Sequence, residues 1–134
     1  MKFEFLEHTA DIKFRAYGKT LNEAFEGAVD AVSYFLARGE KIAPKKGRVI
    51  NVSADDIESL LYKFLEETIF LLDAENFITA KARVIIRGNN LRAELYGDDV
   101  SNYSDLDYIK AVTYSEMYVK KTADGWELQV VLDV

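Results

Sequence analysis

Hydrophobic and polar positions along the chain switch between two periods, and each switch predicts a new element. Apolar and polar residues alternate over 12–17, which predicts a half-buried strand that ends at Gly18. Over 21–36 the apolar residues recur at helical spacing. Thr20 precedes this run, with Glu23 three residues later, and this capping-box pattern marks the start of a helix.

The same order of patterns returns further along the chain. The other predicted elements are a strand at 48–52, a helix over 57–72, a hairpin of 79–88 and 91–97, and a last hairpin of 111–120 and 126–132. Ser53 or Asp55 is expected to cap the second helix. Asn89-Asn90 is expected to form the tight turn of the first hairpin.

The order strand–helix–strand–strand therefore occurs twice, with one copy inside the other. Each predicted helix has one apolar stripe, which a sheet must cover. We expect an α+β protein in which two helices pack on antiparallel sheet. It is expected to form a single domain, with an outer core of about 1–38 and 109–134 and an inserted unit of about 39–108.

Composition and charge narrow the chemistry of these 134 residues. Cysteine is absent and His8 is the single histidine, which excludes disulfide scaffolds, thiol catalysis and multi-histidine or cysteine metal centres. The net charge of −6 argues against a large basic face, so direct nucleic-acid binding is not expected. Charges interrupt the first 14 residues, and no apolar run approaches the roughly 20 residues that span a bilayer. We therefore expect a cytoplasmic protein that makes no membrane contact.

Two aspartates flank the first and last long strands. Asp11 directly precedes the strand that begins at Ile12, and Asp133 follows the strand that ends at Leu132. If these strands pair antiparallel, the two like charges lie together, which is destabilising unless a cation binds between them. With the carboxylate of Val134, these hard oxygen donors suit Ca²⁺, Mg²⁺ or Mn²⁺. The alternative is that both aspartates are solvated caps of strand ends.

Other polar residues near these positions have two readings each. His8 and Thr9 either support the turn around Asp11 or form ordinary turn hydrogen bonds with the backbone. Lys110 begins a strand on which Ser115 lies. Ser115 has no evident base, so a serine triad is not supported and an ordinary amphipathic strand remains the simpler interpretation.

Two charged segments are interpreted as solvated loops. Residues 98–107 carry four aspartates and no basic residue, and the alternatives are a docking surface for a basic partner or further cation ligands. The glycine and final glutamate of an EF-hand are missing there. The short basic cluster of Lys45, Lys46 and Arg48 is too small to anchor RNA by itself. No phosphate-binding loop or nucleophile elbow occurs, so residue chemistry alone identifies no active site.

Four segments together resemble the archease family: EHTADI at 7–12, AYGKTLNEAFEGA at 16–28, KAVTY at 110–114 and VLDV at 131–134. They occur in the family's order and cover nearly the whole chain. The resemblance implies an SHS2-type strand–helix–strand–strand core with an inserted unit. It also implies a protein cofactor of the RtcB-type tRNA-splicing RNA ligase, one that promotes ligase guanylylation and multiple turnover, broadens nucleotide use and is not itself a catalyst.

The resemblance further implies a divalent cation, described as calcium in the family. An early aspartate, a late aspartate and the terminal residue hold it, and the matching positions are Asp11, Asp133 and Val134. Lys110 is retained, but Ser115 stands where the family commonly has a histidine after KAVTY. The preceding stretch, 100–108, also lacks the family's histidine.

Two other function classes remain open from the residues. One is an acidic protein-interaction module or chaperone without a metal. The other is a metal-dependent enzyme acting on small molecules, in which the ion polarises an oxygen. The lack of a nucleophile and a base near the aspartates counts against the enzyme.

Overall fold

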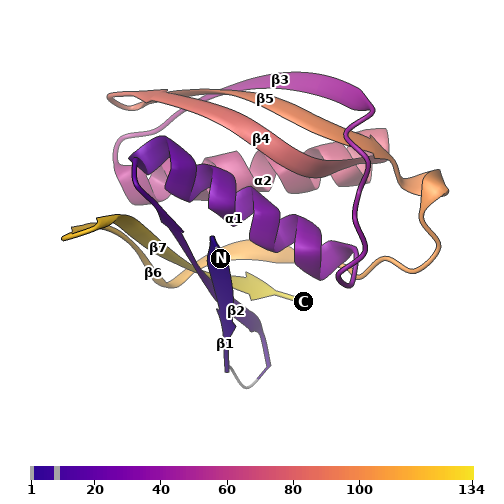
Figure 1. Cartoon of the computed structure of the whole chain (residues 1–134), viewed down its shortest axis with the longest axis horizontal. Helices are drawn as coiled ribbons and strands as arrows, with labels where there is room; N and C mark the ends of the chain where they lie inside the picture. The colour runs from indigo at the N-terminus through magenta and orange to yellow at the C-terminus, as the bar shows by residue number, and fades with distance from the viewer. Residues whose placement is uncertain (1, 8–9) are drawn as a thin grey trace.

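The computed structural model describes residues 2–7 and 10–134, and it consists of two antiparallel sheets with two helices between them (Figure 1). The elements are β1 (Phe3–Leu6), β2 (Ile12–Gly18), α1 (Leu21–Leu36), β3 (Lys46–Ser53), α2 (Ile57–Glu75), β4 (Phe77–Arg87), β5 (Asn90–Asp99), a 3₁₀ turn (Val100–Asn102), β6 (Ala111–Thr122) and β7 (Gly125–Asp133). Among the described residues, neither helix combines the length and apolar character needed to cross a membrane.

The two sheets repeat one topology. The four-stranded sheet has the order β1-β2-β7-β6 and the three-stranded sheet the order β3-β5-β4. In each unit the strand before the helix pairs with the last strand, which therefore lies between the other two. The predicted α+β fold with strand–helix–strand–strand occurring twice is confirmed, and β1 adds one edge strand to the outer copy.

Both helices contact both sheets. α1 packs against β2 and β4, which belong to different sheets, and α2 packs against β6 and β4. Each helix lies in a middle layer with a sheet on either side (Figure 1). The buried residues of α2 follow the predicted stripe, but α1 also buries Gly27, Ala31 and Ser33, so the expectation of a single stripe is wrong for α1. Phe25 of α1 and Phe64 of α2 are fully buried and stack with their ring centroids 5.9 Å apart, which joins the helices in the core.

The two helices begin at side-chain caps. The predicted capping box of α1 is confirmed, because the Glu23 amide donates to Thr20 Oγ1 and the Thr20 amide donates to Glu23 Oε1, both at 3.1 Å. Asp56 caps α2 by accepting from the amide of Ser59 at 2.8 Å. The prediction of Ser53 or Asp55 is wrong, since Ser53 is still paired within β3 and Asp56 directly precedes the first helical turn.

α1 also closes one edge of the three-stranded sheet. β4 is an edge strand, and its Val84 amide donates to Glu26 Oε2 at 2.8 Å. The Ile86 amide donates to Asn22 Oδ1 at 3.0 Å. The acceptors, on Asn22 and Glu26, are about one helical turn apart, and the donors, on Val84 and Ile86, are two residues apart along the strand. These two spacings are similar in length, so both bonds form at once. The bonds satisfy edge amides that would otherwise invite pairing with another strand.

Two strand details differ from the predictions. Residues 3–6 form a strand that the hydrophobic pattern did not predict. The turn of the first hairpin is Gly88-Asn89, because Arg87 pairs with Asn90 and Gly88 adopts a φ of 59° that suits glycine. The turn is thus shifted by one residue from the expected pair.

The basic cluster at 45–48 is only partly a loop. Lys46 and Arg48 lie in β3, which corrects the prediction of a solvated loop. Arg48 Nε donates to Glu75 Oε1 at 2.9 Å, and its guanidinium carbon lies 4.7 Å from the centroid of the Phe77 ring. Arg48 therefore joins β3 to the end of α2 and the start of β4.

Candidate functional site

The first and last long strands pair so that the two predicted acidic residues lie at the same end. β2 and β7 are antiparallel neighbours, and Ile12 pairs with Leu132. Asp11 precedes this pair on one strand and Asp133 follows it on the other. The predicted pairing is confirmed, and residues more than a hundred positions apart in the sequence become neighbours at one edge of the sheet.

β6 brings a third segment to the same place. Ala111 pairs with Asp133, and the Lys110 amide donates to the Asp133 carbonyl oxygen at 2.8 Å. Three adjacent strands thus bring together the end of the EHTAD segment, the start of KAVTY and the end of VLDV. We call Asp11, Lys110, Asp133 and Val134 the tip. His8 and Thr9, also predicted as site residues, lie outside the described residues.

The tip offers hard oxygen donors but few side-chain carboxylates. Asp11, Asp133 and Val134 are all partly exposed. Within the described ranges, 2–7 and 10–134, no three histidine, aspartate or glutamate side chains form a group that could hold a metal. An ion bound by the two aspartates would therefore take its remaining ligands from the oxygens of Val134 and from water. This donor set fits Ca²⁺, which accepts six to eight oxygen ligands in flexible geometry.

A large bulge interrupts β6 beside the tip. Thr113 pairs with Val131, but the next pair is Tyr118 with Gln129, so residues 114–117 lie opposite a single residue of β7. We call 114–117 the β6 bulge. Glu116 within it adopts a left-handed φ of 54°, which is uncommon for a residue other than glycine. Ser115 is exposed in this bulge, so it does not lie on a regular strand as predicted.

Buried hydrogen bonds hold the β6 bulge in place. Gln129 is only 5% exposed, and its Nε2 donates to the Glu116 carbonyl oxygen at 2.7 Å. Its Oε1 accepts from Arg15 Nε of β2 at 3.0 Å. Lys13 Nζ, also on β2, forms an ion pair with Glu116 Oε1 at 3.0 Å. Sequence reasoning missed these residues, and the available signal was a glutamine inside the apolar run 128–132.

An aromatic pair continues this surface onto α2. Tyr114 of the bulge is exposed and stacks on Tyr62, with ring centroids 4.2 Å apart and planes only 7° from parallel. Partial burial raises the pKa of the Tyr62 hydroxyl, and the nearby Glu66 carboxylate adds to this effect. The Tyr62 hydroxyl therefore stays neutral at ordinary pH, and the two rings present a flat aromatic surface where α2 meets the β6 bulge.

The acidic stretch at 98–107 is not a uniform solvated loop. Asp98 is buried and accepts from the Asp99 amide at 2.8 Å, from Asn102 Nδ2 at 3.0 Å and from the Tyr103 hydroxyl at 2.9 Å. Burial opposes ionisation of Asp98, but these hydrogen bonds outweigh it and lower the pKa of the carboxyl below its usual value. The prediction of a solvated loop is therefore wrong for Asp98, which fixes the chain where β5 ends.

Two other aspartates of this stretch face a basic residue. Asp105 Oδ2 lies 3.6 Å from Arg38 Nη1, and Asp107 Oδ2 lies 3.3 Å from Arg38 Nε. These exposed ion pairs connect the stretch to the end of α1. Arg38 therefore balances part of the negative charge of this stretch.

Comparison with known proteins identifies the family of the chain. The model of the archease protein family (MTH1598/TM1083) matches residues 3–134. The chain belongs to the archease family. The archease of Methanosarcina barkeri is 39% identical, and the match covers 99% of this chain and 96% of that protein. The archease of Sulfurisphaera tokodaii is 38% identical, with 99% of both chains covered.

Solved structures show the same archease fold. The solution structure of Methanobacterium thermoautotrophicum protein 1598 superposes with a TM-score of 0.82 at 28% identity, covering 99% of each chain. The crystal structure of a Thermotoga maritima archease, described as a possible chaperone, has a TM-score of 0.61 at 20% identity, covering 96% of this chain and 94% of that one. At that lower identity the second likeness concerns the fold alone.

Proposed function

We propose that this archease is a non-catalytic activator of an RtcB-type tRNA-splicing RNA ligase. In this role it promotes guanylylation of the ligase and multiple turnover, and it widens the range of nucleotides used. One observation carries the proposal: the segments that mark the family, far apart in the sequence, meet in register at the tip. The tip is then the surface that acts on the ligase.

The proposal assigns the tip a divalent cation, with calcium first and magnesium or manganese as alternatives. Asp11, Asp133 and Val134 would hold the ion, which would neutralise the like charges that the pairing of β2 with β7 brings together. Lys110 and Ser115 flank the tip on β6 and are the partner-facing candidates. His8 and Thr9 remain candidates by sequence only.

An activator of this kind works through its preference between two states of the ligase. The shift toward the guanylylation-competent state is limited by how much more tightly the activator binds that state than the other. The β6 bulge and the Tyr62–Tyr114 stack present a rigid surface beside the tip. A pre-ordered surface reduces the conformational entropy lost on docking, so it favours a selective contact.

The test is a reconstituted ligation with excess RNA over ligase, run with and without this protein. We expect Asp11→Ala and Asp133→Ala to abolish most of the stimulation, while Asp73→Ala, at an exposed aspartate on α2, retains it. Formation of the guanylylated ligase from GTP, followed without RNA, locates the affected step. Full stimulation by both tip variants would refute the role of the tip, and no stimulation by the wild-type protein would refute the function.

Calcium binding has a separate readout that needs no ligase. Calorimetric titration of the protein alone with Ca²⁺, Mg²⁺ and Mn²⁺ is expected to show one site, lost in Asp11→Asn and retained in Asp73→Asn. The asparagine variants keep the side-chain shape and remove only the charge. Equal ion binding by Asp11→Asn and wild type would show that the tip carboxylates do not hold the ion.

A further inference from the structure

The outer face of the three-stranded sheet is open to solvent. The helices pack on its inner side, and no described helix or strand covers the other side (Figure 1). Val49 of β3 and Ile85 of β4 are 52% and 44% exposed there, although both are apolar. We call this surface, made by the outward side chains of β3, β5 and β4, the outer face.

Cations form a stripe along this face. Lys81, Arg83 and Arg87 are exposed on β4 at positions of the same parity, so they point to the same side of the strand. Arg92 of β5 pairs with Ile85, which places it diagonally between Arg83 and Arg87. From 81 to 87 the stripe extends for about 20 Å.

These four cations have no carboxylate partner within ion-pair distance in the described part of the chain. Glu94 lies opposite Arg83 in the ladder and accepts from the Tyr96 hydroxyl at 3.3 Å, so it places one carboxylate on this face against four cations. The stripe therefore keeps its positive charge available, in a chain whose net charge is −6. Like charges held together in this way favour an anionic ligand.

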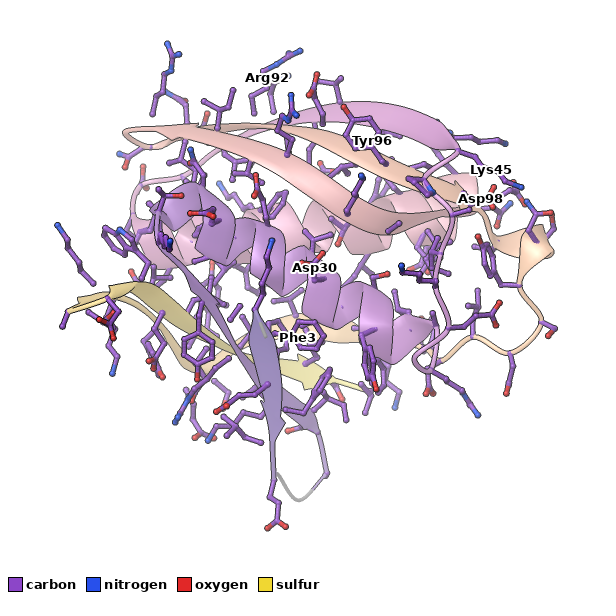
Figure 2. All side chains as sticks on the ribbon, in the orientation of Figure 1. Phe3, Asp30, Lys45, Arg92, Tyr96 and Asp98 are labelled. Atoms are coloured by element: carbon purple, nitrogen blue, oxygen red, sulfur yellow. The ribbon has the colours of Figure 1, made fainter. Side chains whose placement is uncertain are left out.

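Apolar and aromatic side chains lie between the cations. The Tyr96 ring is flanked in its row by Gly47, which adds no side chain, and by Lys81, whose Nζ lies 5.9 Å from the ring centroid. Figure 2 shows Tyr96 and Arg92 on the same open side of the sheet. Val49 of β3 lies in the same ladder row as Arg83, and Ile85 lies on β4 between Arg83 and Arg87, so apolar side chains are interspersed with the cations.

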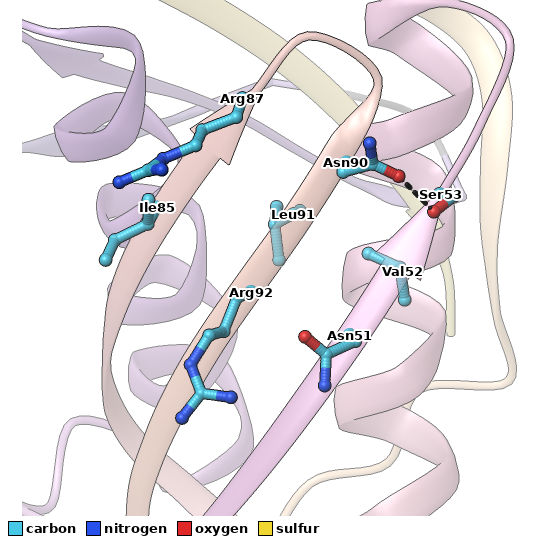
Figure 3. A pocket seen from close by; sticks show the side chains of 8 residues that line it. All are labelled: Asn51, Val52, Ser53, Ile85, Arg87, Asn90, Leu91 and Arg92. Carbon is cyan, nitrogen blue, oxygen red and sulfur yellow. Dashed lines mark hydrogen bonds between the residues drawn. The ribbon is translucent and has the colours of Figure 1, made fainter.

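One end of the face is hollowed. A cavity of about 530 Å³ lies between β3, β5 and the end of β4, with Arg87 and Arg92 beside Ile85, and Asn51 paired opposite Arg92 (Figure 3). Asn90 at the far end accepts from the Ser53 hydroxyl at 2.6 Å, which leaves its amide nitrogen for other partners. The cavity thus combines guanidinium donors, amides and an apolar floor.

We propose that the outer face binds single-stranded nucleic acid. The cationic stripe suits phosphates, and the Tyr96 ring with the apolar side chains of Val49 and Ile85 suits unstacked bases, a combination that open sheets use to bind single strands. The net charge of −6 argued against nucleic-acid binding, because it sums this face with acidic surfaces elsewhere on the chain. The proposal stands on this face alone and does not depend on the proposed role in ligation.

The experiment is a fluorescence anisotropy titration of a labelled oligouridylate of about 12 nucleotides with the full chain. With four phosphate contacts the affinity should fall with a logarithmic salt slope of about −2.8, or about 50-fold between 50 and 200 mM salt. Arg87→Gln with Arg92→Gln removes two contacts, so the slope should fall to about −1.4 and the loss to about 7-fold. No saturable binding by the wild type at the lower salt would overturn the proposal.

The matched control is Lys19→Gln with Lys121→Gln, two exposed cations that lie off the outer face. Both double variants change the net charge by the same amount, and circular dichroism melting checks that both remain folded. The control should keep the wild-type slope, and equal losses in the two variants would refute a specific face. Polyglutamate of similar length serves as competitor. If it displaces the oligouridylate at the same concentration of charge, the face is a site for acidic proteins and the proposal is overturned.

Discussion

Replacing Gln129 by leucine should destabilise the protein far more than a surface glutamine would. Gln129 is buried in β7 and connects two elements, since it accepts from Arg15 Nε of β2 and donates to the Glu116 carbonyl oxygen in the β6 bulge. Leucine has nearly the same size and forms neither bond. The variant therefore leaves the Arg15 guanidinium and the Glu116 carbonyl without these partners, at a partly buried place.

The magnitude follows from the two bonds. The bond to the charged guanidinium of Arg15 contributes about 1.5–3 kcal/mol and the neutral bond to the Glu116 carbonyl about 0.5–1.5 kcal/mol. The additional apolar burial of leucine offsets part of this loss. We expect the free energy of unfolding to fall by about 2–3 kcal/mol, at the upper end of ordinary single substitutions.

The assay is equilibrium unfolding in urea, followed by circular dichroism, on Gln129→Leu, Arg15→Met and the double variant. Because the double variant removes both partners of one bond, its loss should be smaller than the sum of the two single losses by at least about 1 kcal/mol. A loss below about 0.5 kcal/mol for Gln129→Leu, or strict additivity, would refute the conclusion that Gln129 holds the bulge against β2.

Three further results are expected. Gly97→Ala should cost about 2–3 kcal/mol in urea unfolding, because a Cβ there would lie 2.0 Å from the carbonyl oxygen of Ile78, and wild-type stability would contradict that close approach. Asp98→Asn should destabilise the protein at neutral pH, and by less as the pH falls below about 3.8, because a lowered native pKa gives stability that is lost when acid protonates the carboxylate. A loss of stability that does not change with pH across this acid range would contradict this. Burial beside Glu127 raises the pKa of Tyr118 to about 12, so phenolate absorbance from this residue should appear well above pH 10, and Tyr118→Phe should reduce the loss of stability between these pH values.

The repeated order of elements was readable from the sequence because it rests on local rules. Period-two and helical patterns identify strands and helices, and Thr20 with Glu23 satisfies the first amides of α1 whatever surrounds it. The meeting of Asp11 and Asp133 needed only the assumption that two strands pair antiparallel, and the ladder through Ile12 and Leu132 has that register. Such inferences succeed because few long-range details enter them.

The remaining features depend on contacts between segments far apart in the sequence. The β6 bulge forms because Gln129 and Lys13, on two other strands, bond to it, and no pattern within 114–117 encodes those partners. Asp98 looks like any acidic loop residue until Tyr103 and Asn102 fold back onto it. The additional buried residues of α1 were hidden for a similar reason, since Gly27, Ala31 and Ser33 are small or polar and do not stand out as part of an apolar stripe.

The layered fold also explains how one acidic chain can present two surfaces of opposite character. The helices separate the sheets, so the tip, at the edge of the four-stranded sheet, is remote from the outer face of the three-stranded sheet (Figure 1). In physiological salt, exposed charges interact over only about 8 Å. The carboxylates of the tip therefore do not neutralise the positive charge of the stripe on the other side of the helical layer. The proposed cation at Asp11 and Asp133 and the proposed nucleic acid at Arg87 and Arg92 would therefore not compete, so occupation of either surface would leave the other open.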